Sequence, residues 1–192
     1  MSRFARAYGL ATAATSLVLL AIAIPCSSAQ PAASSVEPLG KLLPAAEGSK
    51  VCYARSYGAS HLRRHPRQTV TAITLLLFYG EHPSSGRKGE GPRGYYFNLS
   101  ARLKGQSRIQ RTSGECTVRG TRVWCGVECD GGGLFVDGSS NGITLGFDPS
   151  DARIRMAQPC ETADAVEMKP SVRGEVMKLF KTETARCVGA PR

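Results

Sequence analysis

The chain has 192 residues, of which 42% are hydrophobic and 21% are charged, and its 25 Lys and Arg against 15 Asp and Glu give a formal net charge of +10. This length is enough to bury a sizeable core in one domain and requires no second domain. The excess of positive charge fits either an anionic partner or a solvated basic face with no specific partner, and it does not by itself indicate a fold.

The N-terminus has the order of an export signal. Arg3 and Arg6 precede an apolar stretch over residues 10–24, and the small side chains of Ser27 and Ala29 follow. This order predicts a Sec-type signal peptide over residues 1–29 with cleavage after Ala29. The apolar stretch of ~15 residues is shorter than the ~20 that a membrane-spanning helix needs. We therefore expect a periplasmic or secreted protein with no membrane span after processing; its oligomeric state stays open.

Residues 30–49 are rich in Pro, Ala, Ser and Gly and show no sustained strand pattern. This composition predicts a flexible leader, with a short helical turn possible near residues 39–43. We expect the remaining residues, 50–192, to form a single domain that is mainly β.

Short runs of alternating apolar residues, separated by Gly, Asp, Asn and Pro, begin at residue 51 and indicate short antiparallel strands. In residues 95–104, the side chains of Tyr95, Phe97 and Leu99 point to one face and polar side chains point to the other. The predicted strands cover residues 51–57, 69–79, 95–104, 108–112, 115–119, 122–128, 134–137, 143–147 and 152–156. No helical pattern separates them, so we expect a small antiparallel barrel or sandwich of about eight strands with little helix.

Two segments are less regular. Residues 80–94 contain five glycines and Pro breaks, which predicts a long flexible loop. In residues 172–182, apolar residues recur at helical spacing, yet the run over 176–182 also fits a final strand that closes the sheet. Gly174 disfavours the helix, so we favour the strand.

Seven cysteines become six when Cys26 leaves with the signal peptide. An even set in an oxidising compartment predicts three disulfides. The pairs that we expect are Cys116–Cys125, Cys52–Cys187 and Cys129–Cys160.

The pair Cys116–Cys125 follows from a hairpin. If Gly120-Thr121 is a type II′ loop, glycine supplies the positive φ that this turn needs, and Cys116 lies opposite Cys125. In this register Cys116 and Cys125 form a non-hydrogen-bonded cross-strand pair. The α-carbons of such a pair lie ~4.5 Å apart, which a disulfide can span. The same register places Arg119 opposite Arg122, which is mildly unfavourable unless both are well solvated. A longer loop would instead make Cys129 the mate of Cys116.

Three strings have a possible chemical role, but each has a simpler interpretation. Gly138-Ser139-Ser140-Asn141-Gly142 matches G-x-S-x-G, but no histidine follows it, so a hairpin loop is the better interpretation. The triple glycine after Asp130 indicates either a turn or a close approach of the backbone to a ligand. Asp130 lacks an identifiable acidic partner, so the sequence gives no catalytic residue.

His61 and His65 are four residues apart and could face one way on a helical turn capped by Ser60, as metal ligands would. The arginines among them would repel a divalent cation, so we expect no metal and no cofactor. We interpret residues 61–67 as a short turn that ends at Pro66 and presents cations.

The positive charge is concentrated in residues 50–111, which hold 12 basic and 2 acidic side chains. Four of the cations lie close in sequence and form the candidate anion-binding site: Arg55, Arg63, Arg64 and Arg67. We therefore expect a non-enzymatic envelope or extracellular module whose basic half binds anionic polysaccharide, lipid head groups or an acidic protein, with no nucleic acid. The alternatives are a small β-barrel carrier of an apolar or aromatic ligand, with Tyr95, Phe97, Leu99 and Phe147 inward, and a secreted hydrolase.

Overall fold

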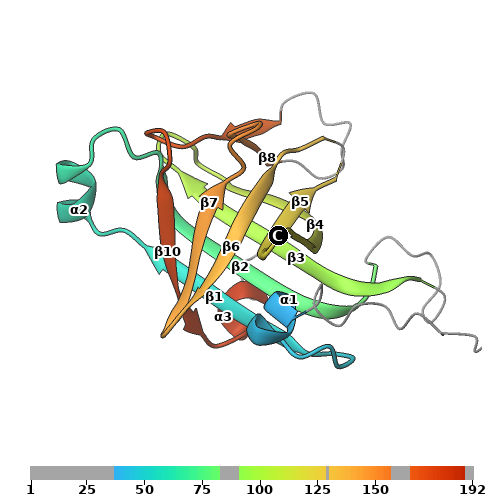
Figure 1. Cartoon of the computed structure of the whole chain (residues 1–192). Coiled ribbons are helices and arrows are strands. Elements are labelled where there is room, and N and C mark those ends of the chain that lie inside the picture. Colours follow the sequence, from blue (N-terminus) through green and yellow to red (C-terminus); the bar gives the residue numbers. More distant parts are fainter. Residues whose placement is uncertain (1–36, 83–90, 129, 157–164, 189–192) are drawn as a thin grey trace, which may run out of the picture. The chain divides into compact units, whose positions relative to one another are not determined.

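Eight antiparallel strands close into a barrel in the computed structural model, which describes residues 37–82, 91–128, 130–156 and 165–188 (Figure 1). Seven of them follow one another along the chain and pair in that order, and the last strand closes the barrel against the first. The strands of the barrel are β1 (Lys50–Ser56), β2 (Val70–Glu81), β3 (Arg93–Leu103), β4 (Ile109–Arg119), β5 (Arg122–Val127), β6 (Gly133–Ser139), β7 (Gly142–Phe147) and β10 (Val176–Thr182). The predicted β architecture is therefore confirmed, as a barrel rather than a sandwich.

Smaller elements lie outside the barrel wall. Between β7 and β10, the chain forms a separate two-stranded sheet of β8 (Ile154–Met156) and β9 (Val166–Met168). The three helices are short: α1 (Glu37–Leu42), α2 (Ala59–Arg64) and α3 (Ala185–Val188). Among the described residues, no helix is long and apolar enough to cross a membrane.

The strands differ from the predicted ones in a few places. Residues 108–112 and 115–119 form a single strand, β4, because the residues between them keep pairing with β3. The three-residue strand β9 was not predicted, whereas residues 176–182 are a strand, as favoured. β2 and β3 also extend into the predicted loop over residues 80–94; residues 83–90 of that loop lie outside the described part of the chain.

Alternate side chains of the strands fill the barrel. Tyr95, Phe97 and Leu99 of β3 are buried, as are inward-facing residues of the neighbouring strands. Large side chains that are almost completely buried come from every strand of the barrel except β1 and β5. Phe147 packs against this core. Eight strands enclose just enough space for side chains to fill, and this barrel uses it in that way.

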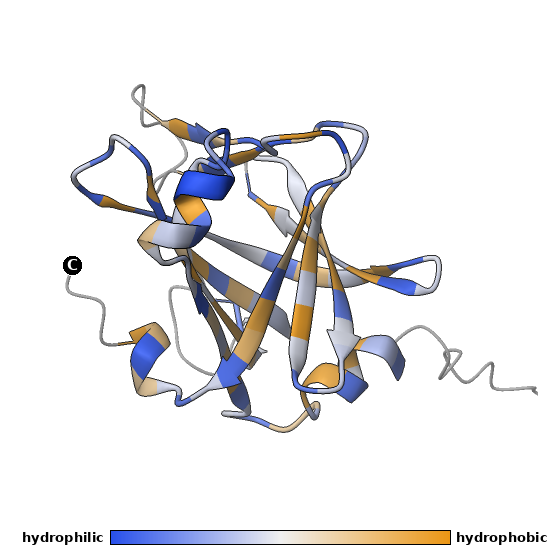
Figure 2. Cartoon of the chain, turned by 90° about the vertical axis from the view of Figure 1, so that its left-hand side faces the viewer, coloured by the Kyte–Doolittle hydropathy of each residue, from blue (hydrophilic) through white to orange (hydrophobic). Residues whose placement is uncertain are grey.

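Both ends of the barrel are covered. At one end, Leu39 and Leu43 of the α1 segment join the core, and at the other end Ile154 and Met168 of the β8–β9 sheet do so. Within the expected leader over residues 30–49, the helical turn considered near residues 39–43 is present as α1, and its leucines pack into the core because they find an apolar surface to cover. Figure 2 shows the alternation of hydrophilic and hydrophobic residues along the wall strands.

The disulfide between Cys116 and Cys125 is confirmed, together with the register that predicts it. Cys116 lies opposite Cys125 and Arg119 opposite Arg122, and the cysteine α-carbons are 4.0 Å apart. Gly120 has a φ of +62°, as the first position of a type II′ loop requires.

The second predicted disulfide, Cys52–Cys187, is also present and fixes α3 against the outer wall of β1 and β2. The pair Cys129–Cys160 and the signal peptide over residues 1–29 lie outside the described residues. Two disulfides suit an oxidising environment, extracellular or periplasmic.

Candidate functional site

Five cations gather where the chain turns back at one end of the barrel, and we call them the basic corner: Arg55, Arg63, Arg64, Arg67 and Lys104. Arg55 is at the end of β1, the next three belong to the α2 segment between β1 and β2, and Lys104 follows β3. Lys104 donates to the carbonyl of Pro66 over 3.4 Å, which joins the two turns. The structure thus brings together all four predicted anion-binding arginines and adds a lysine.

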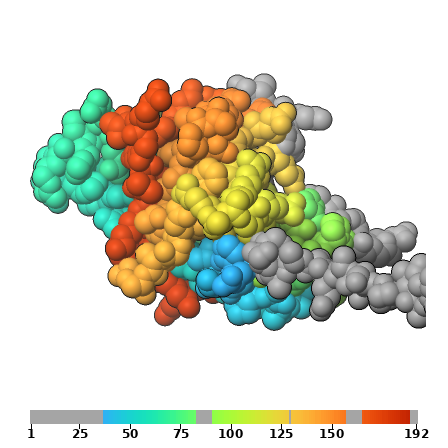
Figure 3. All heavy atoms as spheres, in the orientation of Figure 1, coloured from blue at the N-terminus to red at the C-terminus, as the bar shows by residue number. Residues whose placement is uncertain are grey.

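The α2 segment stands out from the barrel beside β10 (Figures 1 and 3). The helix begins at Ala59 with Gly58 as its N-cap, and no side chain caps it, so the predicted cap by Ser60 is wrong. None of its residues is buried, and Arg63 and Arg64 occupy its last turn, where cations are favoured. The segment thus presents its cations to solvent.

A row of rings and one guanidinium supports this segment. The Arg55 guanidinium lies 5.2 Å from the Tyr57 ring centre, the Tyr57 and His61 ring centres are 4.9 Å apart, and those of His61 and His65 are 4.3 Å apart. His61 also shares a 2.9 Å hydrogen bond with Gln68. The two histidines stack on each other, so their rings serve as packing surfaces in this arrangement.

Burial raises the pKa of Tyr57, while the charge of Arg55 lowers it and that of Glu175 raises it. The Glu175 carboxylate accepts from the backbone N–H of Ser171.

Among the described residues, the cations of the basic corner have no acidic partner. No carboxylate of a described residue forms an ion pair with any of the five. In the second half of the chain, by contrast, Arg119, Arg122 and Arg153 each form at least one ion pair.

A second cluster lies on the outer wall of β4, β5 and β6. The Trp124 indole covers Gly126 and Gly133, where an added β-carbon would collide with it, and the Arg119 guanidinium lies 3.1 Å from a ring centre of Trp124. The Trp124 N–H donates to the Asp148 carboxylate over 2.9 Å. Arg122 has its own acid, Asp137, and the Phe135 ring. These separate partners explain how two opposed arginines are accommodated.

Asp148 is buried and accepts hydrogen bonds from the Ser150 backbone N–H and hydroxyl, from Trp124 and from Arg119. Its burial would raise the pKa, but these donors together hold the pKa of Asp148 below its ordinary value. All four contacts are internal, so we assign this cluster a structural role.

The triple glycine brings two backbone segments together. A β-carbon on Gly132 would lie 2.0 Å from the Arg153 carbonyl oxygen, and the Arg155 N–H donates to the carbonyl of Gly131. Asp130 and Ala152, one in each segment, have positive φ values. The close approach that the glycines permit is therefore to the chain itself.

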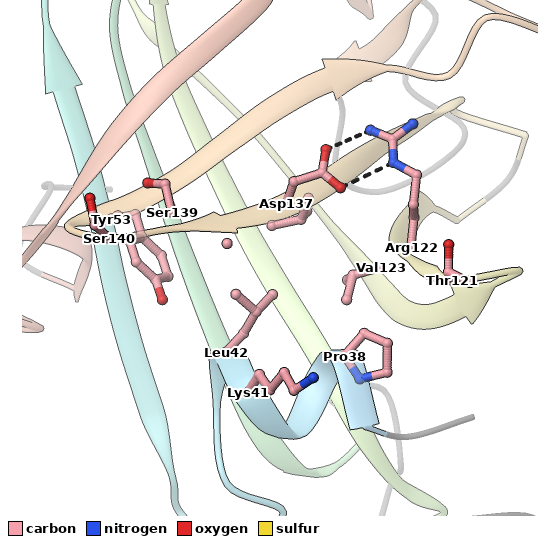
Figure 4. Close-up of a pocket in the computed structure, with 13 residues that line it drawn as sticks. Pro38, Lys41, Leu42, Tyr53, Thr121, Arg122, Val123, Asp137, Ser139 and Ser140 are labelled. Atoms are coloured by element: carbon pink, nitrogen blue, oxygen red, sulfur yellow. Dashed lines mark hydrogen bonds and ion pairs between the residues drawn. The ribbon is translucent and has the colours of Figure 1, made fainter. Parts of the chain in front are cut away.

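The barrel mouth beside α1 has a recess of about 670 Å³ (Figure 4). Tyr53 of β1, Leu42 of α1 and Val136 of β6 supply apolar surface, and the Arg122–Asp137 ion pair lies across from α1. The G-x-S-x-G string forms the β6–β7 hairpin at its edge, with Ser139 paired to Gly142, so the predicted hairpin is confirmed.

Among the described residues, the hydroxyls of Tyr95 and Thr112 are buried without a hydrogen-bond partner. The described residues hold no cluster of three or more potential metal ligands. His82 contacts Glu128 at 2.8 Å, away from the other two histidines.

Comparison of the chain with protein-family models, with curated proteins and with solved structures gives no match.

Proposed function

We propose that this chain is an exported, non-enzymatic binding module that contacts an anionic partner through its basic half, residues 50–111, and chiefly through the basic corner. The observation that carries the proposal is the lack of any ion pair between the corner cations and described carboxylates. Exposed cations without internal partners retain their field for an external anion.

The placement of the corner also supports this proposal. Arg63, Arg64 and Arg67 are exposed on a segment that stands out from the wall. Exposed side chains carry little of the barrel's stability, so their charge is better explained by contact with a partner than by folding. The predicted signal peptide and the two disulfides support export to an oxidising compartment, where surface polysaccharides, lipid head groups and acidic proteins are the available anions.

The test is the affinity of the purified protein for a soluble polyanion, dextran sulfate. The variant Arg63→Ser/Arg64→Ser/Arg67→Ser is compared with Lys41→Ser/Lys181→Ser/Arg186→Ser, which removes the same charge from exposed positions outside residues 50–111 and near the other end of the barrel. At roughly 1 kcal/mol for each cation at an anionic surface, we expect the first variant to lose about 100-fold in affinity and the second much less. Equal losses in both would mean that net charge, not the corner, governs binding.

The recess at the barrel mouth favours a second candidate, a carrier of a small ligand. It combines apolar surface from Leu42, Val123 and Val136 with the Tyr53 ring, beside α1 at one end of the barrel. Native mass spectrometry of the protein purified from its own host tests this function, because a carrier retains a bound compound, and a uniformly ligand-free protein would argue against it.

A further inference from the structure

The outer face of β10 exposes apolar side chains. Val176 is 60% exposed and Phe180 36%, and Val172, in the loop before the strand, is 47% exposed. These are three of the four large hydrophobic side chains that are exposed in the described part of the chain; the fourth is Val188 of α3. Lys178 alternates with Val176 and Phe180 and so projects from the same face.

Val176 and Phe180 are exposed because the residues opposite them on the neighbouring strands are small. Val176 lies opposite Gly146 of β7, and Phe180 lies between Gly142 of β7 and Ala54 of β1. The backbone requires glycine at 142, where a β-carbon would lie 2.0 Å from a carbonyl oxygen of β10. At Gly146 an added β-carbon would have room, because the nearest atom is 3.9 Å away. The packing therefore does not require glycine at this position opposite Val176.

This apolar face is continuous with the basic corner. The Arg55 guanidinium lies 5.1 Å from the Phe180 ring centre and 5.2 Å from that of Tyr57, which leads on to the α2 segment. The Lys178 ammonium lies 5.6 Å from the same ring centre. Cations and exposed apolar groups therefore share one surface, which we call the β10 face: Arg55, Val172, Val176, Lys178 and Phe180.

Few acids oppose these cations. The acid next to Val176 in the sequence is Glu175, whose carboxylate accepts from the Ser171 backbone N–H. Arg173 and Lys178 form no ion pair with a described carboxylate. A recess of about 540 Å³ beside Val176, lined also by Phe147, Pro149 and Pro170, extends the apolar surface toward the end of β7.

We infer that the β10 face and the basic corner together dock on an anionic lipid bilayer. This inference rests on the proposed function and names the partner within it. Cations attract anionic head groups, while exposed valine and phenylalanine side chains gain free energy only where they leave water, at the boundary of the acyl chains. A polysaccharide would satisfy the cations but would leave Val172 and Val176 in water.

The experiment measures co-sedimentation of the protein with phosphatidylcholine vesicles that contain or lack phosphatidylglycerol. The test variant is Val176→Ser/Phe180→Ser, which changes no charge, and the matched control is Val188→Ser, at an equally exposed valine on α3. We expect the test variant to lose about tenfold or more in affinity for anionic vesicles, because it removes the inserted apolar surface. Val188→Ser should bind like the wild type, and neutral vesicles should bind much more weakly.

Dextran sulfate separates this inference from the proposed function. The inference predicts that Val176→Ser/Phe180→Ser binds dextran sulfate as the wild type does. Equal vesicle binding by wild type and this variant would overturn docking through the β10 face. Binding to dextran sulfate without binding to anionic vesicles would also overturn it and leave the proposed function standing, with polysaccharide as the partner. Failure to bind either probe would overturn both.

Discussion

Asp148 is the one charged side chain that is buried among the described residues. The four hydrogen bonds that it accepts, from Arg119, Trp124 and Ser150, connect the β4–β5 hairpin to the segment after β7. We expect Asp148→Asn to lower the free energy of unfolding at pH 7 by about 2 kcal/mol, because hydrogen bonds to a charged acceptor are lost. Asp137→Asn, which breaks a more exposed ion pair, should cost about 1 kcal/mol or less.

The same residue predicts a pH dependence. The pKa of Asp148 is lower in the folded protein than its ordinary value, so the stability that it contributes is present above the ordinary value and is lost as the pH falls through the folded pKa. In urea unfolding, the difference between wild type and Asp148→Asn should therefore shrink as the pH is lowered from about 5 toward 2. If the difference in unfolding free energy between the two proteins stayed constant over this pH range, the charge of Asp148 would not be the source of its stabilising effect.

Thr112 offers the opposite case, since its buried hydroxyl has no partner. Thr112→Val replaces that hydroxyl with a methyl group of similar size. We expect the free energy of unfolding to rise by about 1 kcal/mol, because an unsatisfied buried hydroxyl carries a desolvation cost. Thr144→Val, at a half-buried position on β7, should show no such gain. Chemical denaturation measures the free energy of unfolding of both variants. A Thr112→Val protein that is less stable than the wild type would contradict the conclusion that the Thr112 hydroxyl is unsatisfied.

Among the elements, the outer wall of β5 and β6 depends on glycine under the Trp124 ring. A β-carbon on Gly133 would lie 2.4 Å from the indole nitrogen, so Gly133→Ala should displace the ring, break its bond to Asp148 and cost about 1–3 kcal/mol. Trp124 is the single tryptophan of the chain, so its fluorescence reports the change directly. We expect a red-shifted emission for Gly133→Ala and an unchanged spectrum for Gly146→Ala, where a β-carbon fits. Identical spectra for both would contradict this packing.

The elements also show which features the sequence can predict. The Cys116–Cys125 pair follows from two-residue turn chemistry at Gly120 and from strict alternation, both of which are local. The three-residue strand β9 has too few residues for a periodic signal, and the place of Leu39 in the core depends on a barrel mouth built by distant strands. Local patterns therefore predicted most strands, β8 among them, and one disulfide register, but not β9 or the burial of α1 at the end of the barrel.

At the scale of the whole molecule, the closure of the barrel by β10 and β1 brings together residues of the basic corner and the β10 face that are far apart in the sequence. Arg63, Arg64 and Arg67 are adjacent in the sequence and were predicted as a group. Phe180 joins Arg55 because β10 pairs with β1, a contact between the two ends of the domain that no local pattern reveals. The one available signal was the alternation of valine, lysine and phenylalanine on a strand face that should otherwise be polar.

The salt dependence of polyanion binding tests most directly whether the basic corner, whose cations form no ion pair with a described carboxylate, binds an anionic partner. We expect the affinity of the purified protein for dextran sulfate to fall steeply as the salt concentration rises from about 0.05 to 0.5 M, because counterions screen exposed charges. The variant Arg63→Ser/Arg64→Ser/Arg67→Ser should show a weaker dependence on salt than the wild type. An affinity that does not change with salt, or the same salt dependence in both proteins, would contradict binding through the basic corner.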